Sequence, residues 1–271
     1  MAKKQKETEE VQEEVLMPET ILGDYLKEHK ESHFNLEEKP EATLVSSGSL
    51  LLDLKMSGGL RPGILRVSGV AEGGKTSCTL SFMKNFLDTV KKARGLYIMS
   101  EGRLSAELQV RSGIKFVDQA EDFKDGTCFV FKTNVYETAI GLIRKLVKDN
   151  PYGSKYFFVI DSMDALVPKN DLDRPFEEAN KVAGGSLITS DFLRKMALAL
   201  HVRGHYCVLI SQVRSTVTIN PYQKVDPKLT NASGGNAALH YVSWLLEARE
   251  RFNKDFLWSG EEGKSDRLGH Y

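Results

Sequence analysis

The chain has 271 residues, 41% of them hydrophobic and 27% charged, so it can bury one sizeable core or two modest ones. Its 37 basic residues balance its 37 acidic residues, which excludes a global positive field, so any nucleic-acid binding must come from local patches. The three cysteines lack metal-ligand spacing, and no signal peptide or membrane-length apolar run is found, which predicts a cytoplasmic protein with buried thiols.

Residues 1–42 are predicted to form a polar, acid-rich N-terminal arm. One stretch in it, "ETILGDYLKEHK", places Ile21, Leu22, Tyr25 and Leu26 on one face at helical spacing. We therefore expect a short amphipathic helix in a loose arm, and this helix needs a surface on which to dock.

Residues 43–250 alternate short apolar runs with helical stretches, which predicts an α/β core with a mostly parallel central sheet flanked by helices. The apolar runs are nearly continuous, as is typical of strands that are covered on both faces. The expected strands are 64–69, 95–100, 127–132, 156–162, 205–212 and 241–248, and the expected helices are 75–91, 104–112, 135–148 and 184–203.

The stretch "GVAEGGKTS" fits the pattern G-x-x-x-x-G-K-[ST] between an expected strand and an expected helix, which is the context of a P-loop. In such a loop the glycines let backbone amides surround a β-phosphate, Lys75 neutralises phosphate oxygens and the Thr76 hydroxyl ligates Mg²⁺. The alternative is a glycine-rich turn without a ligand. The residues predicted to contact the nucleotide are Gly69, Glu72, Gly73, Gly74, Lys75, Thr76, Ser77 and, from a later strand, Asp161, with Thr76 and Asp161 at the metal.

Two acidic residues end expected strands. Asp161 follows the apolar run of "YFFVIDS", where a carboxylate is costly unless it is paired or near a metal, so we expect it on a strand neighbouring the P-loop strand. The alternative is a helix cap. Glu101 follows "GLYIMS" and is the candidate for orienting the attacking water, the alternative being a solvated loop residue.

The order of these motifs resembles the RecA-type recombinase family, including its bacteriophage members, from about Ser46 to Glu250. The resemblance is carried by "SSGSLLLDLKMSGGLRPGILRVSG", "EGRLSAELQVRSGIKF", "VIDSMDALVPK", "RKMALALHVRGHYCVLISQVR" and "NASGGNAALHY". It implies a P-loop NTPase of RecA type that binds ATP and Mg²⁺ and assembles into a helical filament, with the arm in a protomer contact. It also implies that Gln212 senses the γ-phosphate and passes its state to a loop, as part of a catalytic set of Glu101, Lys75 and Gln212; the alternative is a solvent-facing strand end.

The resemblance also places two DNA-binding loops, at about 169–185 and 214–235. Loops of this length are usually functional or disordered, and the bland alternative is a mobile surface loop with solvated charges. The first loop is acidic, so DNA is expected only at its 181–185 end. The expected contacts are Lys181, Gly184 and Gly185; Arg214, Lys224 and Lys228 at phosphates; Val217 and Ile219 against bases; and the backbone at Ser233, Gly234, Gly235 and Asn236.

Some positions depart from the family. Ser105 and Leu108 stand where bacterial members carry the aspartate and tyrosine that hold adenine, so base recognition is expected to be loose. Residues 251–271 are expected to be the start of a C-terminal segment that is cut short.

The combined hypothesis is a DNA-dependent ATPase that forms filaments on single-stranded DNA and pairs it with homologous duplex, in the nucleoid or, if phage-encoded, in the host cytoplasm. Loading or mediator proteins are possible partners. The alternatives are a non-hydrolysing, nucleotide-gated mediator of filament assembly and another RecA-fold ATPase such as a helicase.

Overall fold

The computed structural model describes residues 17–32, 34–35, 37, 43–69, 71–102, 104–172, 189–212 and 240–248, and the backbone of 184–188, 256–259 and 266–270. The chain divides into two units, Met1–Lys39 and Pro40–Tyr271. In the first unit, α1 (Pro18–Glu28) starts with a proline in its first turn and is followed by the 3-10 helix η1 (Lys30–Ser32). The side chains of Ile21, Leu22 and Tyr25 on α1 are more than half exposed.

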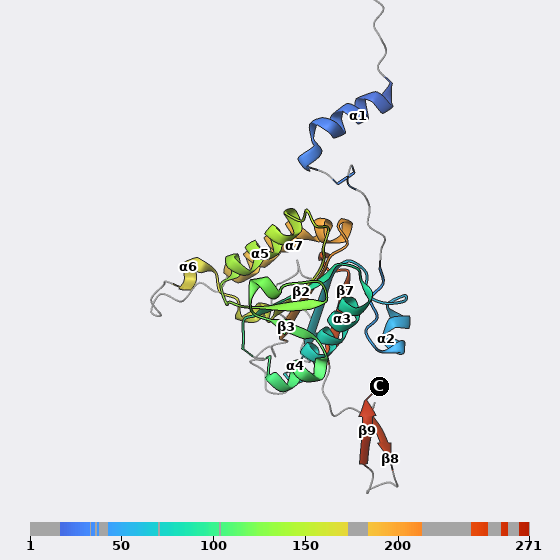
Figure 1. Ribbon diagram of the computed structural model, residues 1–271, viewed down its shortest axis with the longest axis vertical. Coiled ribbons are helices and arrows are strands. Elements are labelled where there is room, and N and C mark those ends of the chain that lie inside the picture. Colours follow the sequence, from blue (N-terminus) through green and yellow to red (C-terminus); the bar gives the residue numbers. More distant parts are fainter. Residues whose placement is uncertain are drawn as a thin grey trace, which may run out of the picture. The chain divides into compact units, whose positions relative to one another are not determined.

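The second unit carries the remaining elements (Figure 1). In chain order they are α2 (Leu50–Lys55), β1 (Gly63–Gly69), α3 (Lys75–Thr89), β2 (Ala93–Met99), α4 (Ala106–Ser112), β3 (Lys115–Val117), η2 (Ala120–Asp122), β4 (Thr127–Lys132), α5 (Tyr136–Lys148), β5 (Lys155–Asp161), η3 (Met163–Ala165), α6 (Lys169–Leu172), α7 (Gly184–Val202), β6 (Tyr206–Gln212), β7 (Trp244–Ala248), β8 (Phe256–Ser259) and β9 (Asp266–His270). Strands β8 and β9 pair with each other in an antiparallel hairpin.

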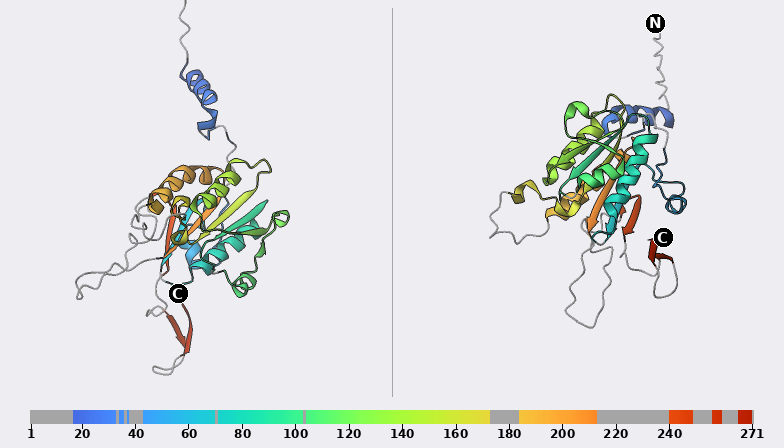
Figure 2. Two further views of the ribbon diagram at one scale, coloured as in Figure 1. Left: turned by 90° about the vertical axis from the view of Figure 1, so that its left-hand side faces the viewer. Right: turned by 60° about the horizontal axis from the view of Figure 1, so that its bottom comes forward.

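The main sheet has seven strands in the order β3-β4-β2-β5-β6-β1-β7, and every pair in it is parallel. Helices α3 and α4 cover one face and α5 and α7 cover the other (Figures 1 and 2). The predicted α/β class with a parallel sheet and flanking helices is confirmed. Since all strands point the same way, their carboxyl ends meet at one edge of the sheet.

The structure differs from the sequence prediction at several elements. Strand β3 was not predicted, because three residues are too few to form an apolar run. The last expected strand, 241–248, begins only at Trp244. The first predicted loop, 169–185, is shorter at both ends, because Lys169–Leu172 forms α6 and α7 begins at Gly184.

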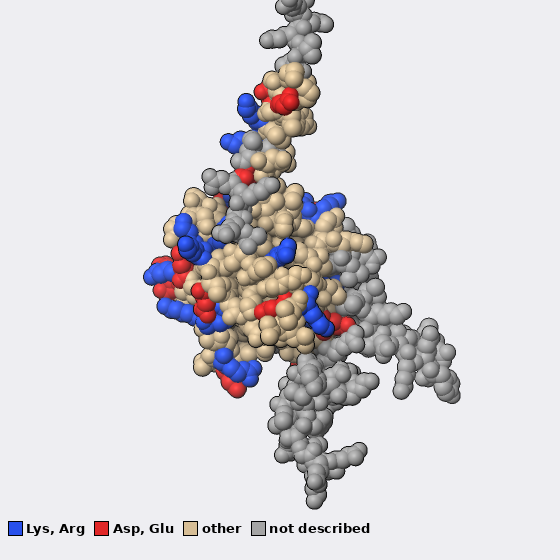
Figure 3. Space-filling view, turned by 90° about the vertical axis from the view of Figure 1, so that its right-hand side faces the viewer, with Lys and Arg blue, Asp and Glu red and all other residues tan. Residues whose placement is uncertain are grey.

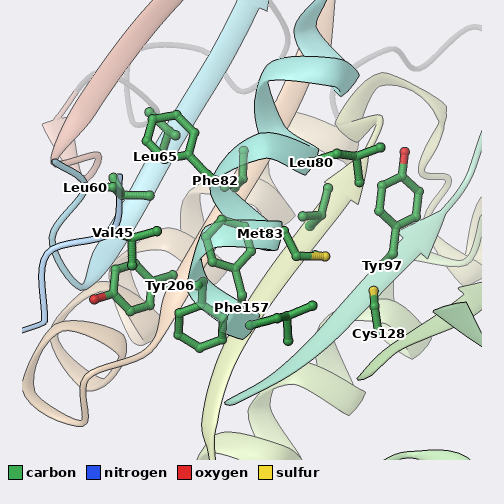
Figure 4. Close-up of a cluster of buried hydrophobic side chains, with 14 of the residues drawn as sticks. Val45, Leu60, Leu65, Leu80, Phe82, Met83, Tyr97, Cys128, Phe157 and Tyr206 are labelled. Carbon is green, nitrogen blue, oxygen red and sulfur yellow. The ribbon is translucent and has the colours of Figure 1, made fainter. Parts of the chain in front are cut away.

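A hydrophobic core lies between α3 and the sheet (Figure 4). Leu80 and Met83 of α3 pack here with Leu65 of β1 and Tyr97 of β2. The ring of Phe86, also in α3, packs in this core against the rings of Phe157 and Tyr206, and the ring centroids lie 5.4 and 5.2 Å apart, respectively. This packing fixes α3, and with it the chain segment that enters the helix, on the sheet.

The three cysteines lie in the second unit. Cys128 and Cys207 are buried, as predicted, whereas Cys78 is only half-buried. Burial raises the pKa of each of the three thiols. Among the described residues, the helices are too short or too polar to cross a membrane.

Two leucines of α7 offer a matched test of this packing. Leu200 is fully buried and Leu198 is 60% exposed. We expect Leu200→Ala to lower the free energy of unfolding by about 2–5 kcal/mol, and Leu198→Ala by less than about 1 kcal/mol, because only the first leaves a cavity. Urea unfolding followed by circular dichroism measures both, and equal losses would contradict the placement of α7.

Candidate nucleotide site

The predicted P-loop connects the buried strand β1 to the start of α3. Gly69 has φ +145°, and a Cβ there would lie 2.1 Å from the backbone oxygen of Ala248, so only glycine fits beside β7. Gly74, with φ +84°, is the left-handed residue from which α3 begins at Lys75. The first turn of α3 therefore lies after the carboxyl end of β1, and the N-terminus of a helix favours an anion.

Lys75 is almost buried, and its Nζ donates a hydrogen bond to the carbonyl oxygen of Gly69 at 3.0 Å. This bond folds the lysine back over its own loop. The loop borders a cavity of about 310 Å³. The cavity is lined by Glu72, Gly73, Gly74, Lys75, Thr76, Ser77, Glu101, Leu108, Asp161, Ser162, Ile210 and Gln212.

Thr76 and Asp161 meet, since the Thr76 hydroxyl donates to Oδ2 of Asp161 at 2.8 Å. The expectation that Asp161 ends a strand next to the P-loop strand is wrong, because β6 lies between β1 and β5. Thr76 still reaches Asp161 because α3 crosses the sheet and contacts β6 and β5. Two hard oxygen donors at one point of a phosphate cavity fit Mg²⁺.

Asp161 has a further partner that the sequence did not indicate. The hydroxyl of Tyr97, from β2, donates to the same Oδ2 at 2.5 Å. Burial, together with the adjacent Asp161 carboxylate, raises the pKa of the Tyr97 phenol. Tyr97 therefore stays a hydrogen-bond donor that orients the carboxylate at neutral pH.

Glu101 lines the same cavity as the loop and follows the end of β2 by two residues. It accepts a hydrogen bond from the hydroxyl of Ser162, which follows a cis peptide bond after Asp161. The side-chain nitrogen of Gln212 lies 3.5 and 3.4 Å from the two Glu101 carboxylate oxygens. The cavity thus gathers Glu101, Lys75 and Gln212, the predicted catalytic set, while Ser162 was missed although it adjoins Asp161 at the strand end.

Ser105 and Leu108 have structural contacts of their own. The Ser105 hydroxyl caps α4 by accepting the Leu108 amide at 3.1 Å. The Leu108 side chain borders the phosphate cavity and also a cavity of about 220 Å³ between α3 and α4. The expectation of loose base recognition at these two positions stays a prediction.

Most of the predicted DNA contacts lie outside the described residues. These are Lys181, Arg214, Val217, Ile219, Lys224, Lys228, Ser233, Gly234, Gly235 and Asn236. Gly184 and Gly185 are described, but in the first turn of α7 and not in a loop. On the face drawn in Figure 3, Lys and Arg are interspersed with Asp and Glu over the described surface.

A parallel α/β sheet that carries G-x-x-x-x-G-K-T at its strand-to-helix turn, beside a strand-end aspartate, defines a P-loop NTPase fold of RecA type. The RecA N-terminal domain family matches residues 27–255, and the chain belongs to this family.

Curated relatives agree at low identity. "Protein RecA" of Rippkaea orientalis is 27% identical over 208 residues, which cover 76% of this chain and 53% of that protein. "Protein RecA" of Wolinella succinogenes is 28% identical over 220 residues, with 79% and 57% covered, and that of Campylobacter fetus is 26% identical over 210 residues, with 76% and 55% covered. The chain spans about half the length of these curated relatives.

Alanine substitutions at two glycines, one in the loop and one in a helix, should change the free energy of unfolding in opposite directions. Gly69→Ala should lower the free energy of unfolding by more than about 1 kcal/mol, because its Cβ would collide with the backbone at Ala248. Gly141→Ala, in the interior of α5 with open space around it, should raise it by about 0.5–1 kcal/mol. Thermal unfolding measures both, and stabilisation by Gly69→Ala would refute the close approach of β1 and β7.

Proposed function

We propose that the protein is an ATP-dependent recombinase that forms helical filaments on single-stranded DNA and promotes homologous pairing and strand exchange in recombination and repair. The observation that carries this proposal is the meeting of Lys75 and Thr76 with Asp161, Glu101 and Gln212 around one cavity. Membership of the RecA family supports the DNA part of the proposal. Such a protein works in the cytoplasm, at the nucleoid or, if phage-encoded, in the host.

ATP binds with its phosphates over the first turn of α3. Lys75 leaves the Gly69 carbonyl and neutralises the β- and γ-phosphate oxygens. Thr76 and Asp161 hold Mg²⁺, which offsets negative charge on the phosphates. The bound nucleotide thereby replaces the contact between Lys75 and a neutral carbonyl with contacts between Lys75 and charged phosphate oxygens.

Hydrolysis is the task of Glu101. Its carboxylate orients a water in line with the γ-phosphate and accepts a proton from it as oxygen adds to phosphorus and the bond to the bridging oxygen breaks, giving ADP and phosphate. The Ser162 hydroxyl holds Glu101 in place. The side-chain amide of Gln212 donates a hydrogen bond to the γ-phosphate instead of to Glu101. The position of the Gln212 side chain therefore depends on which nucleotide is bound.

DNA contacts come from the segments that follow Pro168 and Gln212. Arg214, Lys224 and Lys228 neutralise phosphates, while Val217 and Ile219 contact bases. The partners are single-stranded DNA, homologous duplex and further copies of the chain.

The deciding experiment combines two measurements on the wild-type protein: ATP hydrolysis with and without single-stranded DNA, and electron microscopy of the same mixtures with a slowly hydrolysed ATP analogue. Filaments together with DNA-stimulated hydrolysis are expected. Nucleotide-dependent DNA binding without hydrolysis would identify a mediator, and closed rings would identify a helicase-like assembly.

The phosphate contact of Lys75 can be tested alone. Lys75→Ala should weaken ATP binding by roughly 10- to 150-fold, as expected for a charge-assisted contact worth about 1.5–3 kcal/mol. The control is Lys92→Ala. Lys92 precedes the amino end of β2, where its ammonium group donates to the Tyr152 carbonyl oxygen, so this variant should leave the affinity for ATP unchanged. Titration with a fluorescent ATP analogue measures both, and equal affinities would remove Lys75 from the site.

Glu101→Gln separates binding from hydrolysis. It keeps the shape of the side chain but removes the base, so hydrolysis should slow roughly 10²-fold or more while nucleotide binding persists and DNA-bound protein accumulates. Glu107→Gln, at an exposed acid of α4, is the matched control and should hydrolyse ATP normally. Steady-state phosphate release decides the matter, and equal rates would make Glu101 a solvated loop residue.

A further inference from the structure

A charged side chain is buried in the centre of the sheet. Arg66, in β1, is 2% exposed. Its neighbours Leu65 and Val67 belong to the core under α3, so strand alternation puts Arg66 on the opposite face, which α5 and α7 cover. There its Nε donates to the Ser211 hydroxyl of β6 at 3.1 Å. Burying a guanidinium is costly, so its partners are of interest.

An acidic side chain binds the next residue of β6. Asp164, in η3, accepts the backbone N–H of Gln212 at its Oδ2, with a distance of 2.7 Å. Burial lowers the pKa of the Arg66 guanidinium, and the nearby Asp164 carboxylate acts in the opposite direction. Arg66 and Asp164 therefore bind adjacent positions, Ser211 and Gln212, which are the last two residues of β6.

Asp164 is linked to the cavity through Gln212, which is one of the residues that line it. Gln212 is paired in register with Gly69, the first residue of the P-loop, and its side chain extends to Glu101. A displacement of the end of β6 would move the side-chain amide of Gln212 relative to the P-loop and to Glu101. Neither Arg66 nor Asp164 is among the residues predicted to contact the nucleotide.

We propose that Asp164, with Arg66 at the neighbouring Ser211, is a positioning residue that fixes the end of β6 and so keeps the Gln212 side chain where it responds to the nucleotide. It acts through Gln212 and does not touch the substrate. The inference rests on the proposed role of Gln212 and specifies which residues of this chain sustain it.

The first test does not require activity. Without nucleotide, the backbone N–H of Gln212 should exchange its hydrogen roughly tenfold faster in Asp164→Ala than in the wild type, because the carboxylate that accepts its hydrogen bond is gone. The control is Asp125→Ala, which removes the acceptor of Arg94 at the amino end of the sheet and should leave this amide unchanged. Unchanged exchange in Asp164→Ala, measured by nuclear magnetic resonance, would overturn the proposal.

The second test measures coupling. Fluorescence anisotropy gives the affinity for single-stranded DNA with and without an ATP analogue. Asp164→Ala should reduce the nucleotide-dependent gain by about tenfold, and should cause no further loss in a Gln212→Ala background, because both changes interrupt one connection. Additive losses in the double variant would overturn the proposal. A wild-type protein without any nucleotide response would refute the proposed function, while the exchange test would still decide whether Asp164 positions Gln212.

A third variant separates positioning from folding. Replacing both charges, in Arg66→Met with Asp164→Leu, should recover the melting temperature lost in Asp164→Leu alone, because the guanidinium that would stay buried without a nearby carboxylate is removed as well. The nucleotide response should not recover, since the acceptor for the Gln212 amide is still missing. Recovery of both stability and response would show that the pair only stabilises the fold.

Discussion

Parallel pairing of β1, β2, β5 and β6 brings the carboxyl ends of four strands to one edge of the sheet. Each end contributes a group to the same cavity: the P-loop after β1, Glu101 after β2, Asp161 in β5 and Gln212 in β6. In an antiparallel sheet of the same strands, alternate ends would lie at opposite edges. The site is therefore a consequence of strand direction before it is a consequence of any single residue.

Crowding acidic groups at a partly buried edge requires hydrogen-bond donors. Asp161 accepts hydrogen bonds from the hydroxyls of Thr76 and Tyr97, and Glu101 accepts one from the hydroxyl of Ser162. These donors hold each carboxylate in one orientation, which a site for phosphates and Mg²⁺ needs before the ligand arrives. The same principle holds outside the cavity lining, where Asp164 accepts a hydrogen bond from the backbone N–H of Gln212 and lies near the buried Arg66.

Much of the fold could be predicted because its sequence patterns are local. The expected strand 127–132 coincides with β4, and the helix expected over 135–148 begins one residue later as α5. Strand β3 was missed because its three residues carry too little pattern, and the beginning of β7 was misplaced. The helical turn of Lys169–Leu172 was taken for a loop because its polar sequence resembles one. All of the predicted DNA contacts, those of Gly184 and Gly185 included, stay predictions.

The sequence by itself determined the α/β class, the P-loop and the acidic residues that end strands, because glycine spacing and apolar runs act over a few neighbouring residues. Only the tertiary structure decided which strands are neighbours. It inserted β6 between β1 and β5, and joined Tyr97 to Asp161 and Asp164 to Gln212. The physical reason is that strand order and the hydrogen bonds between distant segments depend on how the whole sheet packs against α3, α5 and α7, which no local pattern encodes.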